Sequence, residues 1–173
     1  MSLLDLGCGP GLLLDYLEAT GGRRGIAYQG IDLSPRMIAA ARSRWPNENF
    51  SVRDIMTDPL PEQSVDYVIA NGVLTARCSV ERSKMVRLAQ QLITAAFQSA
   101  RMGIAFNVMS AHVDWERDDL FHWQFDEVAA FLKKAVSRHF VFRFDYGLYE
   151  FTTYVWRNPQ RPIPVSREMW WQR

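Results

Sequence analysis

The chain has 173 residues, of which 48% are hydrophobic and 23% are charged, a composition typical of one globular domain with a sizeable core. The formal net charge is +1, so no overall charge favours attachment to nucleic acid or to an anionic membrane. There is no apolar run long enough to span a bilayer and no signal-peptide pattern, and the two cysteines, Cys8 and Cys78, make no disulfide framework. We therefore expect a cytoplasmic protein that binds neither nucleic acid nor a membrane.

The stretch 3–13 predicts a strand, a tight turn and the start of a helix. An apolar run that contains Asp5 leads into three glycines at alternate positions, Gly7, Gly9 and Gly11. Glycines let a ligand approach the main chain closely, and the free N–H groups of the following helix point back at the turn. Such a turn suits a nucleotide-like ligand, and a purely structural turn without a ligand is the alternative.

The glycine spacing separates two families of nucleotide-binding proteins. The dinucleotide fingerprint Gly-x-Gly-x-x-Gly would need a glycine where Leu12 stands. The pattern Asp-x-Gly-x-Gly-x-Gly, complete from Asp5 to Gly11, resembles the first motif of the class I S-adenosylmethionine-dependent methyltransferases. The resemblance implies S-adenosyl-L-methionine as the cofactor. It also implies that Asp5 supports the turn and the methionine amino group, and that Gly7 and Gly9 let the methionyl part lie on the backbone.

A helix over 12–20 and a short strand over 27–31 are expected next, followed by Asp32. The expected inward face of the helix is formed by Leu13, Tyr16 and Leu17. Asp32 lies 21 residues after Gly11, and an acidic side chain at the end of the second strand of such units accepts hydrogen bonds from ribose hydroxyls. We expect Asp32 to hold a ribose, with a helix-start or turn aspartate as the alternative.

Ser34 and Pro35 predict the start of a helix that runs to about Trp45. The stretch 32–37 resembles the second motif of the same family, in which residues after the acid pack beside the adenine. This resemblance implies that Leu33 and Met37 contact the cofactor, although packing in the core is the alternative for Met37.

A third strand is expected over 49–53, with Asp54 at its end. The resemblance implies that Asp54 accepts a hydrogen bond from the exocyclic amine of adenine and that the backbone N–H of Ile55 meets the ring. A surface aspartate before a turn is the alternative. The range 56–63 contains two prolines and predicts a loop.

The fourth strand, 65–70, has a continuous apolar end that indicates burial on both faces of a sheet. Asn71 follows it and is expected to face the cofactor, because ligands of doubly wound sheets lie beyond the carboxyl ends of the strands. The chain lacks the Asn/Asp-Pro-Pro-aromatic motif that many relatives acting on exocyclic or amide nitrogens carry here. Its absence argues against methylation of adenine in DNA and of glutamine.

A long helix over 80–99 and a strand over 101–108 lead into a loop over 110–123 at the active edge of the sheet. The loop mixes aromatic rings with carboxylates and histidines, as a binding wall does. His112, Trp115 and His122 are candidates for substrate contact, and the two histidines are candidate general bases. An ordinary loop anchored by its aromatic residues is the alternative. No metal site is expected, because the three histidines lack ligand spacing.

The chain then predicts a helix over 126–137, with Ala135 among its inward residues, and strands over 140–146 and 150–157 that form a hairpin. The expected fold class is α/β: a doubly wound, mostly parallel seven-stranded sheet with a C-terminal antiparallel hairpin and helices on both faces. The expected domain is 1–157, followed by a proline-containing tail, 158–173, that packs on the body or meets a partner. The family's usual N-terminal helix is missing, which suggests a truncated chain or a misplaced start.

The resemblance implies methyl transfer from S-adenosylmethionine to a small-molecule acceptor. It identifies no catalytic residue, because the cofactor's methyl group is already activated and alignment is the main requirement. Two alternatives stay open: a non-catalytic methyltransferase-like binding module and an NAD(P)-dependent oxidoreductase. A homodimer is also expected if a second copy covers apolar surface left at the first strand.

Overall fold

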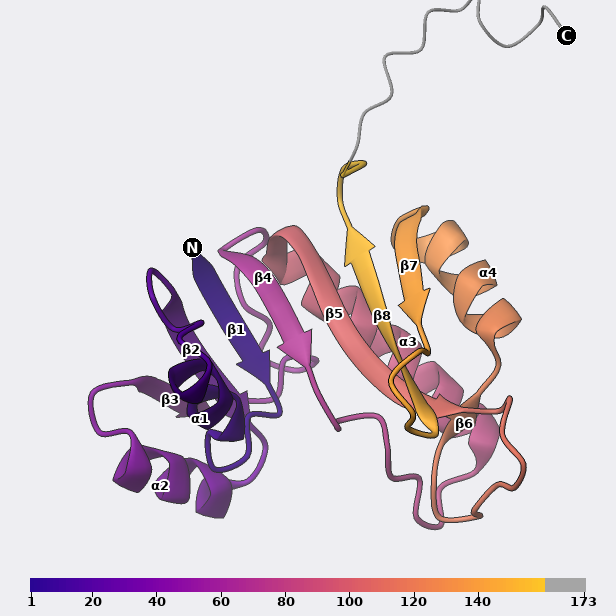
Figure 1. The fold of residues 1–173 in the computed structure, drawn as a ribbon, viewed down its shortest axis with the longest axis horizontal. Coiled ribbons are helices and arrows are strands. Elements are labelled where there is room, and N and C mark those ends of the chain that lie inside the picture. Colours follow the sequence, from indigo (N-terminus) through magenta and orange to yellow (C-terminus); the bar gives the residue numbers. More distant parts are fainter. Residues whose placement is uncertain (161–173) are drawn as a thin grey trace, which may run out of the picture.

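A computed structural model describes residues 1–160 of the chain (Figure 1). The range 161–173, with Pro162, Pro164, Trp170 and Trp171 of the expected tail, lies outside the described residues.

The centre of the molecule is a mixed sheet with the strand order β3-β2-β1-β4-β5-β8-β7. The strands are β1 (Ser2–Leu6), β2 (Ala27–Asp32), β3 (Asn49–Val52), β4 (Val65–Ala70), β5 (Ala100–Ser110), β7 (His139–Arg143) and β8 (Glu150–Trp156). The first five pair in parallel, whereas β8 runs antiparallel to both β5 and β7. The predicted fold class, an α/β doubly wound sheet that closes with an antiparallel hairpin, is confirmed.

An eighth strand corrects the expectation of an uninterrupted loop over 110–123. β6 (His122–Trp123) pairs in parallel with the end of β5, where Met109 lies opposite His122 and Ser110 lies opposite Trp123. A strand of two residues carries no alternation that a sequence pattern can reveal.

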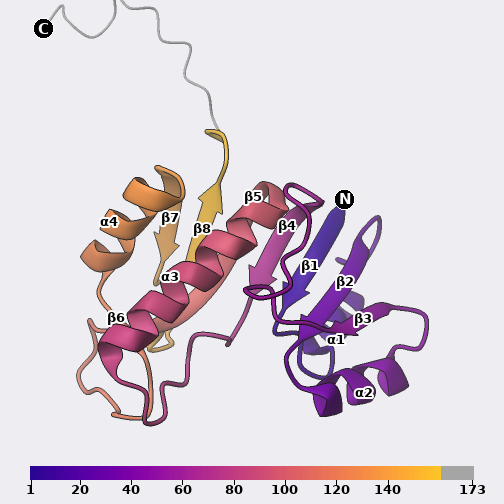
Figure 2. The same cartoon turned by 180° about the vertical axis from the view of Figure 1, so that it is seen from behind.

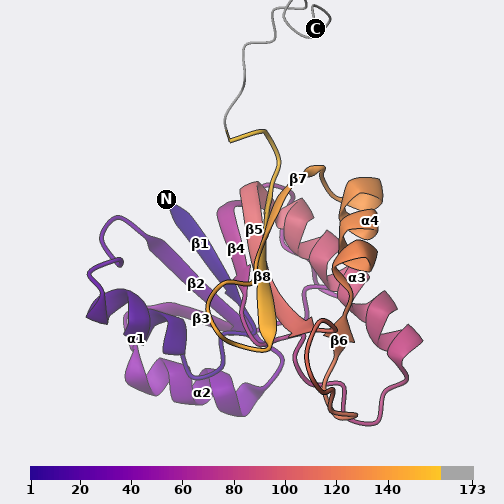
Figure 3. The same ribbon diagram turned by 45° about the vertical axis from the view of Figure 1, so that its right-hand side comes forward.

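Two helices cover each face of the sheet. They are α1 (Leu12–Ala19), α2 (Pro35–Arg44), α3 (Arg82–Ser99) and α4 (Phe125–Ala135). α3 packs against β4 and β5 on the face of the sheet that Figure 2 turns toward the viewer. A view nearer to the sheet edge shows α1 and α2 on one side and α3 and α4 on the other (Figure 3). None of the helices within residues 1–160 combines the length and the apolar character needed to cross a bilayer.

Each face of the sheet has its own hydrophobic core, and β1 contributes to both because its side chains alternate between the faces. Leu3 packs with Leu14 of α1 and Ile38 of α2. Leu4 packs into the larger core, with residues of α3 and α4 such as Leu132. The apolar end of β4 is buried as predicted, with Val68 and Ala70 at 1% and 5% exposure.

Two predicted helix faces need correction. In α1 the buried side chain is Leu14, flanked by the half-buried Leu13 and Leu17, whereas Tyr16 is 64% exposed. The helix turns its 13, 14 and 17 positions to the sheet, so a tyrosine two residues after Leu14 points away. In α4, Ala135 is exposed because it is the last helical residue, one turn beyond the residues that pack on the sheet.

The closing hairpin is shorter than predicted. β7 ends at Arg143, opposite Thr152 of β8, so 144–149 form the connection instead of continuing the strand. The alternation holds within β7, where Phe142 faces the core and Val141 is exposed, but Phe144 is 41% exposed.

Candidate functional site

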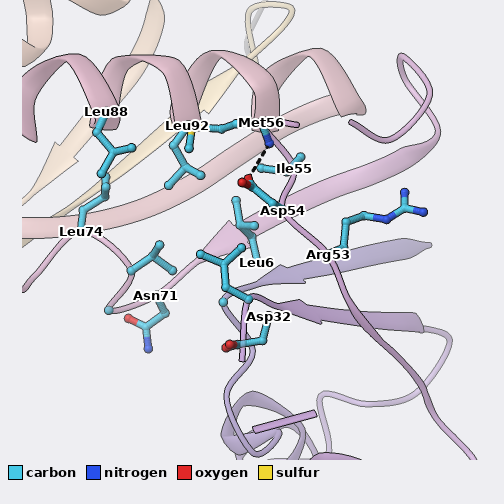
Figure 4. A pocket seen from close by; sticks show the side chains of 14 residues that line it. Leu6, Asp32, Arg53, Asp54, Ile55, Met56, Asn71, Leu74, Leu88 and Leu92 are labelled. Atoms are coloured by element: carbon cyan, nitrogen blue, oxygen red, sulfur yellow. Dashed lines mark hydrogen bonds between the residues drawn. The ribbon is translucent and has the colours of Figure 1, made fainter. Parts of the chain in front are cut away.

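A cavity of about 380 Å³ opens at the carboxyl ends of β1, β2, β3 and β4. This size lies in the range of small-molecule sites. Six residues proposed from the sequence line it: Gly7, Asp32, Leu33, Asp54, Ile55 and Asn71. They come from the ends of four strands, and the parallel pairing of the strands brings them to one edge (Figure 4).

The turn after β1 is fixed against β2 and the loop after β4. The backbone N–H groups of Gly7 and Cys8 both donate to the carbonyl oxygen of Ile31, at 2.8 and 3.0 Å. Gly7 has a φ of +73°, and a Cβ atom there would lie 2.4 Å from a methyl carbon of Val73. Only glycine allows both this left-handed conformation and the close approach of Val73. The backbone therefore requires the glycine that the motif predicts at this position.

Asp32 joins the glycine turn to the start of α2. Its Oδ2 accepts a hydrogen bond from Gly9 N–H at 2.9 Å, and its Oδ1 accepts one from Ser34 N–H at 2.8 Å. Each carboxylate oxygen has a second lone pair, and the side chain lines the cavity. Asp32 is therefore oriented to accept two further hydrogen bonds from a ligand diol.

Asp54 stands on the opposite wall of the cavity. Its Oδ1 accepts a hydrogen bond from Met56 N–H at 2.9 Å, which holds the loop after β3 in place (Figure 4). Ile55 beside it is only 1% exposed and forms part of the cavity floor. A carboxylate next to an apolar floor can accept from an amine on a planar ring.

Asp5 lies beneath the glycine turn and outside the cavity wall. It is 3% exposed, and Tyr28 Oη donates to its Oδ2 at 2.7 Å. Burial raises the pKa of the Asp5 carboxyl from 3.8 to about 6, although the Tyr28 hydrogen bond acts in the opposite direction. Gly9, Gly11 and Met37 are also absent from the residues that line the cavity, and Met37 is 43% exposed on α2.

An apolar wall completes the cavity, and much of it was not expected from the sequence. Leu88 and Leu92 of α3 face Leu74 from the loop after β4 (Figure 4). Leu92 is half-buried against the core, whereas Leu88 is 39% exposed. Leu6, Arg53, Met56, Gly72 and Val73 also line the cavity. The sequence signal that could have identified these five residues is their place beside the predicted site residues along the chain.

The loop between β5 and β6 is anchored by His122, which corrects its proposed role as a general base. His122 is 7% exposed, and its Nε2 accepts a hydrogen bond from Arg117 N–H at 3.2 Å. The proton is therefore on Nδ1, which donates to the carbonyl oxygen of Ser110 at 2.7 Å. Both ring nitrogens are used within the loop, so neither is available for a substrate proton.

The other two loop candidates are exposed. The ring of His112 stacks on Phe125 with a centroid distance of 4.8 Å. Trp115 is 52% exposed and lies 5.4 Å, between ring centroids, from Tyr149 in the connection between β7 and β8. Within residues 1–160, no three His, Cys, Asp or Glu side chains are grouped as a metal site.

Comparisons with known proteins agree with this geometry. Residues 3–96 match the family described as "Methyltransferase domain". A Mycobacterium tuberculosis protein provisionally named a methyltransferase is 33% identical over 156 residues, which are 89% of this chain and 92% of that protein. The trans-aconitate 2-methyltransferase of Escherichia coli is 44% identical over 70 residues, but these are only 40% of this chain and 27% of the relative.

Solved structures show the same fold at low sequence identity. Magnesium protoporphyrin IX methyltransferase from Synechocystis, crystallised with bound S-adenosylhomocysteine (SAH), is 16% identical with a TM-score of 0.65; the match covers 90% of this chain and 73% of that one. A methyltransferase from Aquifex aeolicus is 20% identical with a TM-score of 0.60, covering 90% of this chain and 81% of the other.

Proposed function

The chain belongs to the methyltransferase-domain family of class I S-adenosylmethionine-dependent enzymes, and from this premise we propose that it transfers a methyl group to a small-molecule acceptor. Its cofactor is S-adenosylmethionine, which supplies an activated methyl group. The observation that carries the proposal is the cavity where Gly7, Asp32 and Asp54 meet from three strand ends.

The residues of this cavity suit the parts of an adenosyl group. Asp32 would accept hydrogen bonds from the two ribose hydroxyls, because its oxygens are already fixed by the amides of Gly9 and Ser34. Asp54 would accept from the adenine amine, the backbone N–H of Ile55 would meet the ring, and Leu33 would pack beside it. The chain itself contributes orientation and exclusion of water, which together account for much of the barrier lowering in such transfers.

A small acceptor agrees with the charge and with the relatives. The net charge of +1 gives no field for nucleic acid. Two of the proteins named above are named for trans-aconitate and for magnesium protoporphyrin IX, both small molecules. Cys8 and Cys78 are free thiols, which supports a reducing compartment such as the cytoplasm.

Calorimetric titration of the purified chain tests the proposal. S-adenosylmethionine and SAH are expected to bind with micromolar affinity, and NAD at the same concentrations is expected not to bind. Binding of NAD alone would favour an oxidoreductase and contradict the proposal. Binding of none of the three would contradict a cofactor site in this chain.

A second measurement distinguishes an enzyme from a binding module. The chain with bound S-adenosylmethionine is offered pools of small molecules, and release of SAH is followed by mass spectrometry. Acceptor-dependent release is expected. Cofactor binding without release across broad pools would favour the non-catalytic module.

A further inference from the structure

A buried asparagine connects the cofactor cavity to a carboxylate that the proposed cofactor site does not use. Asn107 of β5 is 6% exposed. Its Oδ1 accepts a hydrogen bond from Gly72 N–H at 2.7 Å, and its Nδ2 donates to Glu150 Oε2 at 2.7 Å. Gly72 lines the cavity, so two hydrogen bonds link the cavity wall to the carboxylate.

The strand directions place Glu150 at the same edge of the sheet. It is the first residue of β8 and pairs with Met109, near the carboxyl end of β5. β8 is antiparallel to β5, so it begins near the end of β5, beyond the level at which β4 ends (Figure 1). Glu150 therefore lies beyond the loop after β4, on the side of the cavity away from Asp54.

The asparagine also fixes the role of the carboxylate. A backbone N–H can only donate, so the Asn107 oxygen must face Gly72 and its NH₂ group must face Glu150. Glu150 consequently acts as an acceptor there and keeps its second oxygen for another donor. Among the ion pairs formed within residues 1–160, none includes Glu150.

Two exposed rings lie near the start of β8, where Glu150 stands. Tyr149 precedes Glu150 and is 45% exposed, and its carbonyl oxygen accepts a hydrogen bond from Ser110 N–H at 2.8 Å. Trp115 contacts the Tyr149 ring from the loop after β5. The pair forms an exposed apolar surface at the start of β8.

We propose that Glu150 is the acceptor-side carboxylate of this methyltransferase and that the acceptor is a neutral amine or hydroxyl carried on a planar apolar group. This inference rests on the proposed function. The acceptor's N–H or O–H proton passes to a Glu150 oxygen. The acceptor's lone pair forms the new bond to the methyl carbon, and the carbon–sulfur bond breaks with its electron pair left on sulfur. Asn107 is a positioning residue whose two hydrogen bonds fix Glu150 relative to Gly72.

A binding experiment tests the placement without knowledge of the acceptor. Sinefungin is an SAH analogue in which a carbon bearing an amine replaces the sulfur, so its ammonium group occupies the place of the transferred methyl group. The natural chain is expected to bind sinefungin more tightly than SAH. Glu150→Gln is expected to weaken the binding of sinefungin by at least about fivefold, because the attraction between the carboxylate and the nearby ammonium group is lost. The affinity for SAH, which has no such charge, is expected to change by less than about twofold.

Two further variants distinguish a role of Glu150 at the methyl position from a general effect of substitution. Glu116→Gln removes an exposed carboxylate of the loop after β5 and is expected to change neither affinity. Asn107→Leu keeps Glu150 but removes the hydrogen bond that orients its side chain. This variant is expected to show a smaller preference for sinefungin over SAH, while its circular dichroism spectrum stays native. If Glu150→Gln lowers both affinities equally, or neither, Glu150 does not face the methyl position. If the natural chain binds neither compound, the proposed function itself is wrong and the inference falls with it.

The acceptor class is tested directly with trans-aconitate. A tricarboxylate would bring negative charge to Glu150, and like charges at this range repel. No methylation of trans-aconitate is expected in an assay that follows SAH release. Turnover of trans-aconitate would overturn the assignment.

Discussion

Asp5 and Asp32 show how two aspartates of the same predicted site take different tasks. Asp32 lies at the cavity, where the amides of Gly9 and Ser34 fix both of its oxygens. Asp5 lies under the turn, and Tyr28, whose own pKa is raised by burial, donates to it. The sequence motif identifies both residues, but only the structure shows that Asp32 lines the cavity whereas Asp5 is buried against Tyr28.

Asp5→Asn is expected to make stability less dependent on pH. The pKa of Asp5 is raised from 3.8 to about 6 in the folded chain, so the folded state binds this proton more tightly than the unfolded state. The free energy of unfolding therefore falls as pH rises from about 4 to 6 and stays lower above 6. The free energy of unfolding of D5N, relative to that of the natural chain, should therefore increase by up to about 3 kcal/mol between pH 4 and pH 7.5.

Urea unfolding at several pH values measures this difference. Tyr28→Phe removes the hydrogen bond that opposes the shift, so its stability should fall more steeply over the same interval. A constant difference between D5N and the natural chain from pH 4 to pH 7.5 would show that Asp5 has an ordinary pKa.

Asp32→Ala is expected to lower the affinity for SAH about 10- to 100-fold, because hydrogen bonds from the ribose to a charged acceptor are lost. Calorimetric titration provides the affinities. Asp145→Ala, at an aspartate whose side chain is 67% exposed beyond β7, is the matched control and should bind normally. Unchanged affinity in the Asp32 variant would remove this residue from the ribose site.

At the scale of elements, the ladder between β5 and β8 depends on one glycine. A Cβ atom at Gly103 would lie 2.3 Å from the carbonyl oxygen of Val155, a backbone atom that cannot move without opening the ladder. This ladder positions Asn107 and Glu150, because both belong to it. No motif in the sequence marks Gly103, since the close approach arises only when the hairpin returns to β5.

Gly103→Ala is expected to destabilise the chain by about 3 kcal/mol through overpacking against β8. Chemical denaturation followed by circular dichroism measures the change. Gly22→Ala is the control, because its Cβ would meet the end of the flexible Leu17 side chain at 3.3 Å. Equal stability of the two variants would contradict the close approach at β5.

At the scale of the whole molecule, β1 ties the two hydrophobic cores together. Leu14 belongs to the core under α1 and α2, and Leu132 belongs to the core under α3 and α4. Both side chains are fully buried, and the same strand packs into both cores. We expect the two halves of the chain to unfold together.

Leu14→Ala and Leu132→Ala test this cooperativity. Each is expected to cost about 2–5 kcal/mol and to shift one common transition. Tryptophan fluorescence and far-ultraviolet circular dichroism should give the same midpoint in each variant. Separate midpoints for the two probes would show that the cores unfold independently.

The sequence by itself determined most of the elements and six of the residues that line the cavity proposed to bind the cofactor. Local signals were sufficient because the glycine turn, Asp32 and Asp54 each follow a strand directly, and parallel strands bring such ends to one edge. The continuous apolar end of 65–70 likewise predicted the burial of β4.

The tertiary structure decided what depends on long-range contact. It turned Tyr16 to solvent, used both nitrogens of His122 within a loop, and added Leu88 to the cavity. It also joined Asn107 to Gly72 and Glu150, which are 35 and 43 residues away along the chain. No local pattern encodes such pairs, because their hydrogen bonds exist only after β5 has been placed between β4 and β8.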